Sequence, residues 1–260
     1  MYLHLRNILL IIFALVASFS TSFADRQVQF QAGDRFVYDL YWNFIKVGRA
    51  ELSFSLSTPE NPPEDHLLAS FSVQTSGIAD KLFKVRDHIE SWIDPETGRP
   101  SLYKKKQREG KTERDIELTF DWDNLTAIYT RNGQTSAPLP ITENTFDPLA
   151  LITRLTQNDF IQNREFEQAT TDGKEIVYIR ASLEESKKIK IKAGRFESHR
   201  IEVATNELEG VFEKSPDASI EIWLSTHSPS IPLKMKSEVA VGSFYGELRS
   251  GIYQGRPIGE

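Results

Sequence analysis

The sequence contains no cysteine. It therefore cannot form disulfides, carry a lipid on an N-terminal cysteine thioether, or use a thiolate as a nucleophile. Its stability has to come from packing alone. An exported chain without disulfides fits a bacterial periplasm better than a eukaryotic secretory route, where Asn124-Leu125-Thr126 would be a glycosylation site.

The sequence also lacks a hydrophobic run long enough to span a bilayer. Its main apolar run, residues 8–17, falls well short of the roughly twenty residues that a membrane-spanning helix needs. Arg6 precedes this run and Ser22-Phe23-Ala24 follows it, which is the pattern of a cleavable signal peptide. We expect a signal peptide over residues 1–24, a single β-rich exported domain over 25–260, no integral membrane span after cleavage, and a periplasmic location.

An excess of positive charge is missing as well. Acidic residues outnumber lysine and arginine 37 to 31, and the formal net charge is −6. This balance is a poor match to phosphate backbones, so we expect no nucleic-acid partner. The densest basic stretches are residues 103–108 and the alternating Lys188, Lys190 and Lys192. Both are interpreted as solvated strand faces, with binding to an anionic surface as the open alternative.

Apolar and polar residues alternate with period two along most of the chain. Ala50, Leu52 and Phe54 point to one side while Glu51 and Ser53 point to the other, which is typical of a half-buried strand. Similar runs are joined by short turns such as Asn132-Gly133, which favour antiparallel hairpins. Expected strands cover residues 36–44, 49–56, 67–75, 88–93, 101–107, 115–122, 127–131, 176–181, 187–192, 195–205, 220–224, 233–241 and 244–250.

One segment follows a helical period instead. Leu149, Ile152 and Leu155 are spaced by three, with Asp147 as the expected N-cap and Pro148 at the first helical position. The polar residues 157–167 are either a linker or a short second helix. The predicted fold is mainly β: a large antiparallel meander sheet, curved or half-barrel, with one or two short helices and a two-layer sandwich as the alternative.

Candidate metal ligands are few. His88 and Glu90 share one strand face, and Asp121 and Asp123 flank Trp122 near a strand end. A metal centre needs at least a third ligand and an oriented second shell, and a calcium loop needs a glycine and a closing glutamate that are missing here. We expect no metal and no cofactor.

Catalytic signatures are equally weak. His199 lies on the same strand face as Ile201 and Val203, which indicates a buried histidine with a structural partner. Ser225 is not in a glycine-flanked nucleophile elbow and is better explained as part of a turn. We therefore predict no catalytic residues.

Aromatic residues recur along the expected strands, and Tyr41 and Trp42 place rings on both faces of one of them. The concave face of a curved sheet must be filled by a helix or a ligand. We expect Trp42, Phe54 and Phe120 to line an apolar cavity. The first functional hypothesis is a periplasmic, non-enzymatic carrier of an apolar small molecule or lipid; a cell-envelope assembly factor with a protein partner ranks second, and an enzyme of unknown reaction third.

Three motifs resemble an uncharacterised bacterial exported family, domain of unknown function 3108. They are the opening residues 36–42 with Val47-Gly48-Arg49-Ala50, the central Asp147-Pro148-Leu149-Ala150, and the closing Ile222-Trp223-Leu224-Ser225 with Ile231-Pro232-Leu233. The resemblance implies an exported β-rich domain. Such proteins look similar in general shape to the half-closed sheets of lipoprotein-localisation carriers, a likeness of fold that does not settle function.

Overall fold

The computed structural model describes residues 30–60, 62–204, 219–227, 230–239 and 242–259. The expected signal peptide, residues 1–24, lies outside the described residues.

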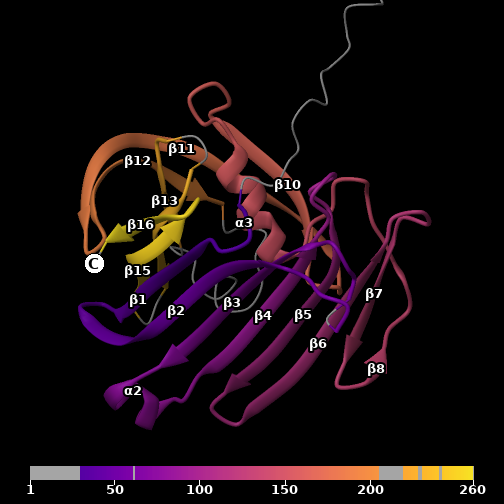
Figure 1. The fold of residues 1–260 in the computed structure, drawn as a ribbon. Coiled ribbons are helices and arrows are strands. Elements are labelled where there is room, and N and C mark those ends of the chain that lie inside the picture. The colour runs from indigo at the N-terminus through magenta and orange to yellow at the C-terminus, as the bar shows by residue number, and fades with distance from the viewer. Residues whose placement is uncertain (1–29, 61, 205–218, 228–229, 240–241, 260) are drawn as a thin grey trace, which may run out of the picture.

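The N-terminal half of the described chain supplies one run of neighbouring strands, which lie side by side in Figure 1. Its longer strands are β1 (Arg35–Trp42), β2 (Ile45–Leu56), β3 (Leu67–Thr75), β4 (Arg86–Ile93), β5 (Pro100–Glu109), β6 (Thr112–Asp121) and β7 (Thr126–Arg131). Two short strands, β8 (Gln134–Thr135) and β9 (Leu139–Pro140), pair with β7.

The C-terminal half supplies the second run: β10 (Glu165–Thr171), β11 (Ile176–Ile191), β12 (Gly194–Val203), β13 (Ser219–Ser225), β14 (Pro232–Val239), β15 (Gly242–Tyr253) and β16 (Arg256–Gly259). Strands adjacent in the sheet are consecutive in sequence, except for the short β9, which pairs with β7, and for β15, which pairs with β1 and joins the two runs. The result is one large antiparallel sheet, strongly curved and not closed, rather than a two-layer sandwich. The predicted fold class is confirmed.

The strands of the C-terminal run form a curl of their own. β11 and β12 form a long hairpin that arches over β15 and β16 in Figure 1. Residues 176–181 and 187–192, expected as two strands, belong to the single strand β11, which has an irregular register between Leu183 and Glu185. At the hairpin tip, the amide of Ala193 donates to the carbonyl oxygen of Leu248 on β15. The tip is therefore fixed to the middle of the sheet.

Residues 157–167 contain neither a domain linker nor a second helix. The preceding helix ends at Gln157, a short connection follows, and Glu165 begins strand β10. A second helix lies elsewhere: α2 (Gly77–Leu82) follows β3 and buries none of its residues. No helix within the described ranges is long and apolar enough to cross a membrane.

Helix α3 (Pro148–Gln157) confirms the sequence prediction in detail. The Asp147 carboxylate accepts hydrogen bonds from the amides of Leu149 and Ala150, at 2.8 and 2.9 Å, and Pro148 occupies the first turn. These contacts satisfy amides that the helix leaves without partners. The helix packs against β3, β4 and β10 on the inner face of the sheet.

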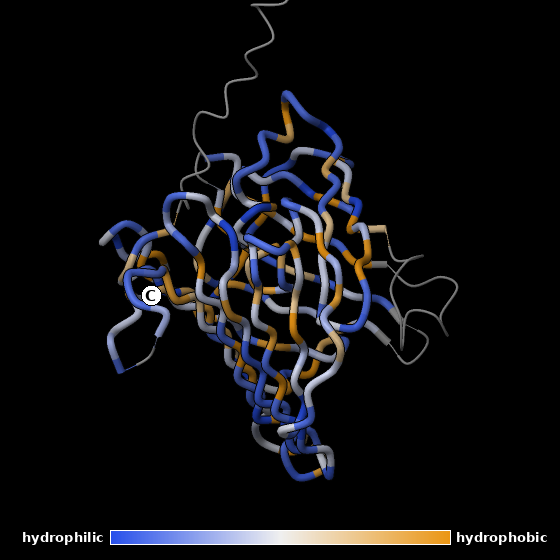
Figure 2. Tube along the Cα trace, turned by 90° about the vertical axis from the view of Figure 1, so that its right-hand side faces the viewer, coloured by the Kyte–Doolittle hydropathy of each residue, from blue (hydrophilic) through white to orange (hydrophobic). Residues whose placement is uncertain are grey.

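Two apolar clusters form the core, and α3 joins them. Leu149 and Ala150 belong to the larger cluster, with side chains from β1 to β7, β11, β13, β14 and β15. Leu155 belongs to the smaller cluster, with side chains from β10 to β13. Figure 2 shows hydrophobic and hydrophilic residues interleaved along the strands, as expected for a sheet with one buried face.

Candidate ligand cavity

An apolar cavity of about 270 Å³ lies on the inner face, where α3 does not fill the curve of the sheet. It is bounded by β1, β2, β3, β14 and β15 and by one turn of α3. Apolar side chains form most of its wall, among them Leu40, Leu52, Phe71, Ile152, Met235 and Phe244.

The pairing of the strands explains this wall. Met235 on β14 lies opposite Gly246 on β15, and Gly246 lies opposite Leu40 on β1. Side chains alternate between the faces of a strand. The next row therefore faces the other side of the sheet, and it is polar: Lys234, Glu247 and Asp39.

Two small residues, Gly246 and Ala50, line the cavity. Gly246 is closely packed: a Cβ atom there would lie 3.2 Å from Cδ2 of Leu40, so a side chain at this position would displace the side chain of Leu40. The wall is apolar because of the strand alternation.

One polar group of the wall is a buried hydroxyl with a partner. The hydroxyl of Tyr38 donates to the carbonyl oxygen of Pro232 at 2.9 Å, and burial raises the pKa of Tyr38 well above its ordinary value. Among the described residues that line the cavity, none carries a carboxylate or an imidazole; Lys234 and Tyr245 at its edge also line the polar hollow described below. The cavity can bind an apolar molecule by burial.

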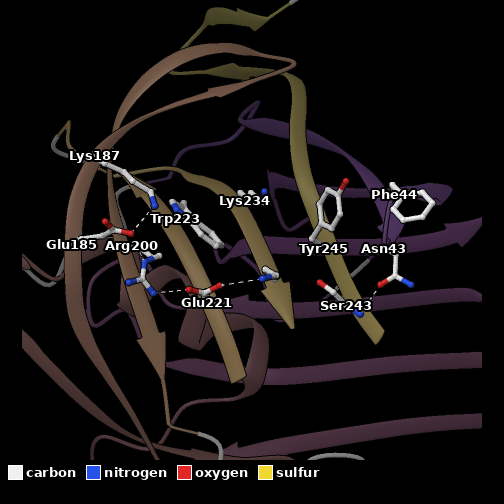
Figure 3. Close-up of a pocket in the computed structure, with 11 residues that line it drawn as sticks. Asn43, Phe44, Glu185, Lys187, Arg200, Glu221, Trp223, Lys234, Ser243 and Tyr245 are labelled. Carbon is white, nitrogen blue, oxygen red and sulfur yellow. Dashed lines mark hydrogen bonds and ion pairs between the residues drawn. The ribbon is translucent and has the colours of Figure 1, made fainter. Parts of the chain in front are cut away.

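A second, polar hollow of about 760 Å³ lies on the opposite face, inside the curl of β11 to β15 (Figure 3). Arg200 bridges two carboxylates there: its Nε lies 2.7 Å from Oε1 of Glu185, and its Nη1 lies 2.6 Å from Oε1 of Glu221. The hydrogen bond to Glu185 raises the pKa of Arg200 further above its already high value. Each carboxylate has a second cation nearby, Lys187 at 2.6 Å from Glu185 and Lys236 at 3.8 Å from Glu221, and the network ties β11, β12 and β13 together.

Aromatic rings continue the polar hollow towards β15. The ammonium group of Lys234 lies 5.3 Å from the ring centroid of Trp223 and 4.8 Å from that of Tyr245. The ring of Tyr245 stacks on that of Tyr41 at 4.7 Å. This row of cation–π and stacking contacts holds β13, β14, β15 and β1 in register on the polar face.

Asp39 is the centre of charge on the same face. Its side chain is fully buried, and burial alone would raise its pKa; hydrogen bonds from Lys192 and Lys46 outweigh that effect and hold the pKa below its ordinary value. Lys192 is at the tip of the β11–β12 hairpin, 153 residues away along the chain. Four cations converge on this carboxylate: Lys46 at 2.5 Å, Lys192 at 2.6 Å, Arg249 at 3.6 Å and Arg49 at 3.7 Å.

The three ligand-contact residues expected from the sequence have different positions. Phe54 and Phe120 are buried in the larger cluster, where Phe54 stacks on Phe30 at 4.3 Å and Phe120 on Trp122 at 5.5 Å. Trp42 is 41 % exposed and stacks on Phe244, which does line the cavity. None of the three is among the lining residues of the two hollows. Whether a ligand contacts them stays a prediction.

The cavity residues that sequence reasoning missed are Met235, Phe244, Gly246 and Ile152. Strands β14 and β15 were expected, but their partners were not, and β15 reaches β1 from about 200 residues away. Glycine at position 246 inside an apolar strand was the one available signal, because such a glycine often marks a place where a ligand or another part of the chain approaches closely.

The candidate metal ligands lie in two separate groups of two residues each. Nε2 of His88 lies 3.4 Å from Oε1 of Glu90. Asp121 accepts hydrogen bonds from Asn124, and these lower the pKa of its carboxyl group. Within the described part of the chain, no three histidine or acidic side chains are grouped so that they could hold a metal ion.

The other sequence candidates have structural partners. Nδ1 of His199 lies 2.8 Å from Oγ of Ser186, and burial lowers the pKa of the imidazole. Oγ of Ser225 accepts a hydrogen bond from the amide of Ile231. Both agree with the structural interpretation of these residues.

A single curved antiparallel sheet with a helix and an apolar cavity on its inner face defines a β-rich, half-open class of fold. The family model described as "Protein of unknown function (DUF3108)" matches residues 37–249, so the chain belongs to this family. The resemblance found in the motifs is confirmed.

The fold is also similar to a solved structure, described as a beta-barrel-like protein of domain of unknown function DUF1849 from Brucella abortus. The TM-score is 0.57 and the identity 11 %, over 84 % of this chain and 96 % of the other. At this identity the likeness shows the fold alone. No curated protein matches the chain.

The family motifs have clear structural roles. Asp147-Pro148 starts α3, as described above. Gly48, in the opening motif, faces the backbone of β3: a Cβ atom there would lie 2.2 Å from the carbonyl oxygen of Gln74. A side chain at Gly48 would therefore force β2 and β3 apart.

Proposed function

We propose that this chain is an exported, periplasmic, non-enzymatic binding protein for an apolar ligand. The observation that carries the proposal is the apolar cavity between α3 and the sheet. Two of its apolar lining residues, Met235 and Phe244, are exposed and mark its mouth. The export pattern in residues 1–24 and the lack of cysteine support the periplasmic location.

The size of the cavity limits the ligand. Small-molecule sites commonly enclose roughly 300–1,000 Å³, and this cavity of about 270 Å³ lies just below that range. It suits one acyl chain or a small ring system rather than a lipid with several chains. Burial of the ligand against the wall would contribute most of the affinity, because most of the lining side chains are apolar.

Titration with a naphthalene sulfonate tests the proposal, since its fluorescence rises in an apolar site. Wild-type protein is expected to show saturable binding. Met235→Trp places a larger ring at the mouth, and we expect it to weaken binding at least about tenfold, the effect of filling an apolar contact site.

Ile161→Trp is the matched control, because Ile161 is 64 % exposed in the connection after α3 and lines neither hollow. It is expected to bind the probe like wild type. Absence of a saturable site in folded wild-type protein, or equal binding by Met235→Trp, would contradict the carrier hypothesis.

A role in envelope assembly is the second candidate function. It is favoured by several large apolar side chains that are exposed at one end of the sheet. Exposed apolar patches often mark interaction sites.

A further inference from the structure

One end of the sheet carries a rim of exposed apolar side chains. Phe44 is 88 % exposed, Leu82 79 % and Ile78 77 %. We define the apolar rim as these three residues together with Trp42, Ile45, Phe83 and Phe244, all of which are exposed.

Backbone hydrogen bonds bring the segments of the rim together. The amide of Ser76, just before α2, donates to the carbonyl oxygen of Val47 on β2, and the amide of Asn43 donates to the carbonyl oxygen of Ser243 on β15. The amide of Gly110 in the β5–β6 turn donates to the carbonyl oxygen of Lys84. The β1–β2 turn, α2 and the start of β15 therefore share one end, and Figure 1 shows α2 beside the ends of the neighbouring strands.

The exposure of α2 is unusual for a short helix. A helix of this length is normally stabilised by burying one face, whereas α2 buries no residue. Its apolar side chains instead point away from the sheet, at positions 78 and 82. The rim thus presents apolar surface that the described chain does not cover.

Three lysines lie next to this apolar surface. Lys81, Lys84 and Lys111 are exposed around α2 and the adjacent β5–β6 turn, and the structure shows no ion pair within 4.0 Å for them among the described residues. The nearby Asp80 is held by Arg86 at 2.7 Å, which lowers the pKa of its carboxyl group. The same turn also carries Glu109 and Glu113, so the lysines supply exposed positive charge at the rim beside these two acids, on a chain whose net charge is −6.

The rim is continuous with the apolar cavity. Phe244 belongs to the rim and also lines the cavity, and its ring stacks on that of Trp42 at 6.2 Å. Met235, the other exposed apolar residue of the cavity wall, lies on β14 opposite Gly246, two residues along β15 from Phe244. A ligand that enters the cavity from this end passes the rim.

We propose that the apolar rim docks onto a lipid surface that bears anionic headgroups, with Phe44 and Leu82 inserted at the interface and the lysines at the level of the phosphates. Exposed aromatic and aliphatic side chains next to unpaired lysines are the combination that binds such surfaces. This inference deepens the proposed function and rests on it, because docking would place the cavity mouth against the membrane that supplies the ligand.

Vesicle sedimentation tests the inference. Mature protein is mixed with vesicles of phosphatidylcholine alone or with one-third phosphatidylglycerol. Binding to the anionic vesicles is expected, with a loss at high salt because the lysine contribution is screened. Phe44→Ser with Leu82→Ser is expected to weaken binding at least about tenfold, and Lys84→Gln with Lys111→Gln on the order of twentyfold.

Ile161→Ser and Lys174→Gln, at exposed sites away from the rim, are the matched controls and should bind like wild type. The rim variants should keep naphthalene sulfonate binding, and Met235→Trp should keep vesicle binding, so the two proposals fail separately. Equal binding to both kinds of vesicle, no binding to either, or a self-associated state that Phe44→Ser disrupts would overturn the lipid-surface assignment.

Discussion

Asp147 shows how one residue serves both local structure and the core. Its carboxylate caps α3 and accepts a hydrogen bond of 2.6 Å from Oγ of Ser91 on β4, in a fully buried position. Burial opposes the charge more strongly than these hydrogen bonds favour it, which raises the pKa of Asp147 to about 6.

The raised pKa of Asp147 predicts a pH effect with a definite sign. From its ordinary pKa of 3.8 to about 6, the folded chain holds a proton that the unfolded chain has lost. The free energy of unfolding therefore falls as pH rises through this window and levels off above it. Asp147→Asn removes the titration, so the difference in the free energy of unfolding between variant and wild type should change by about 2.4 kcal/mol between pH 4 and pH 7.

Urea unfolding at several pH values measures this difference. Asp123→Asn is the control, because Asp123 is exposed in the turn after β6; its profile should run parallel to that of wild type. A parallel profile for Asp147→Asn would show that the buried carboxyl group does not titrate in this window.

At the scale of elements, the long β11–β12 hairpin depends on one buried carboxylate. Asp39 on β1 holds the hairpin tip through Lys192, and Lys46 and Arg49 of β2 approach the same carboxylate. Asp39→Asn would leave these cations without their common partner. Their side chains are 34–51 % exposed and can turn to water, which limits the loss.

We expect Asp39→Asn to lower the free energy of unfolding by about 2 kcal/mol. This value lies between the small effect of breaking an exposed ion pair and the larger effect of removing one partner of a buried ion pair. Amide hydrogen exchange should rise first at residues 187–196, around the hairpin tip. Asp115→Asn, which removes an exposed pair with Arg108, is the control and should change stability by less than about 0.5 kcal/mol. Unchanged exchange at the tip would contradict the anchoring role.

The sequence predicts those elements whose signals lie within a few neighbouring residues. The strands and α3 follow from alternation and from the Asp147-Pro148 start signal, which act within a few residues. α2 was missed because it has no buried face, and β10 was missed because residues 157–167 are polar. The cavity follows from the pairing of β15 with β1, which sequence patterns cannot specify.

At the scale of the whole molecule, a single curved sheet has two faces that differ in polarity, because side chains alternate between the faces of each strand. The inner face holds α3 and the apolar cavity, and the outer face holds the Arg200 network and Asp39. The placement of Phe54 and Phe120 shows that aromatic content alone did not identify the cavity, because Phe54 packs on Phe30 and Phe120 packs on Trp122.

The expected export of the chain gives a direct prediction. We expect mature protein to begin at Asp25, because Ser22 and Ala24 are the small pair correctly spaced after the apolar run. N-terminal sequencing of protein from the periplasm measures the start. A start more than about three residues away, or recovery of the intact chain in the membrane fraction, would count against the expected signal peptide.

Native mass spectrometry of protein purified from the cells that produce it tests the ligand site without a chosen probe. We predict a mass excess of one small apolar molecule per chain, which falls to a trace in Met235→Trp and is retained in Ile161→Trp. Wild-type protein that is folded and carries no such adduct, or an adduct that persists unchanged in Met235→Trp, would contradict the assignment of the cavity as a ligand site.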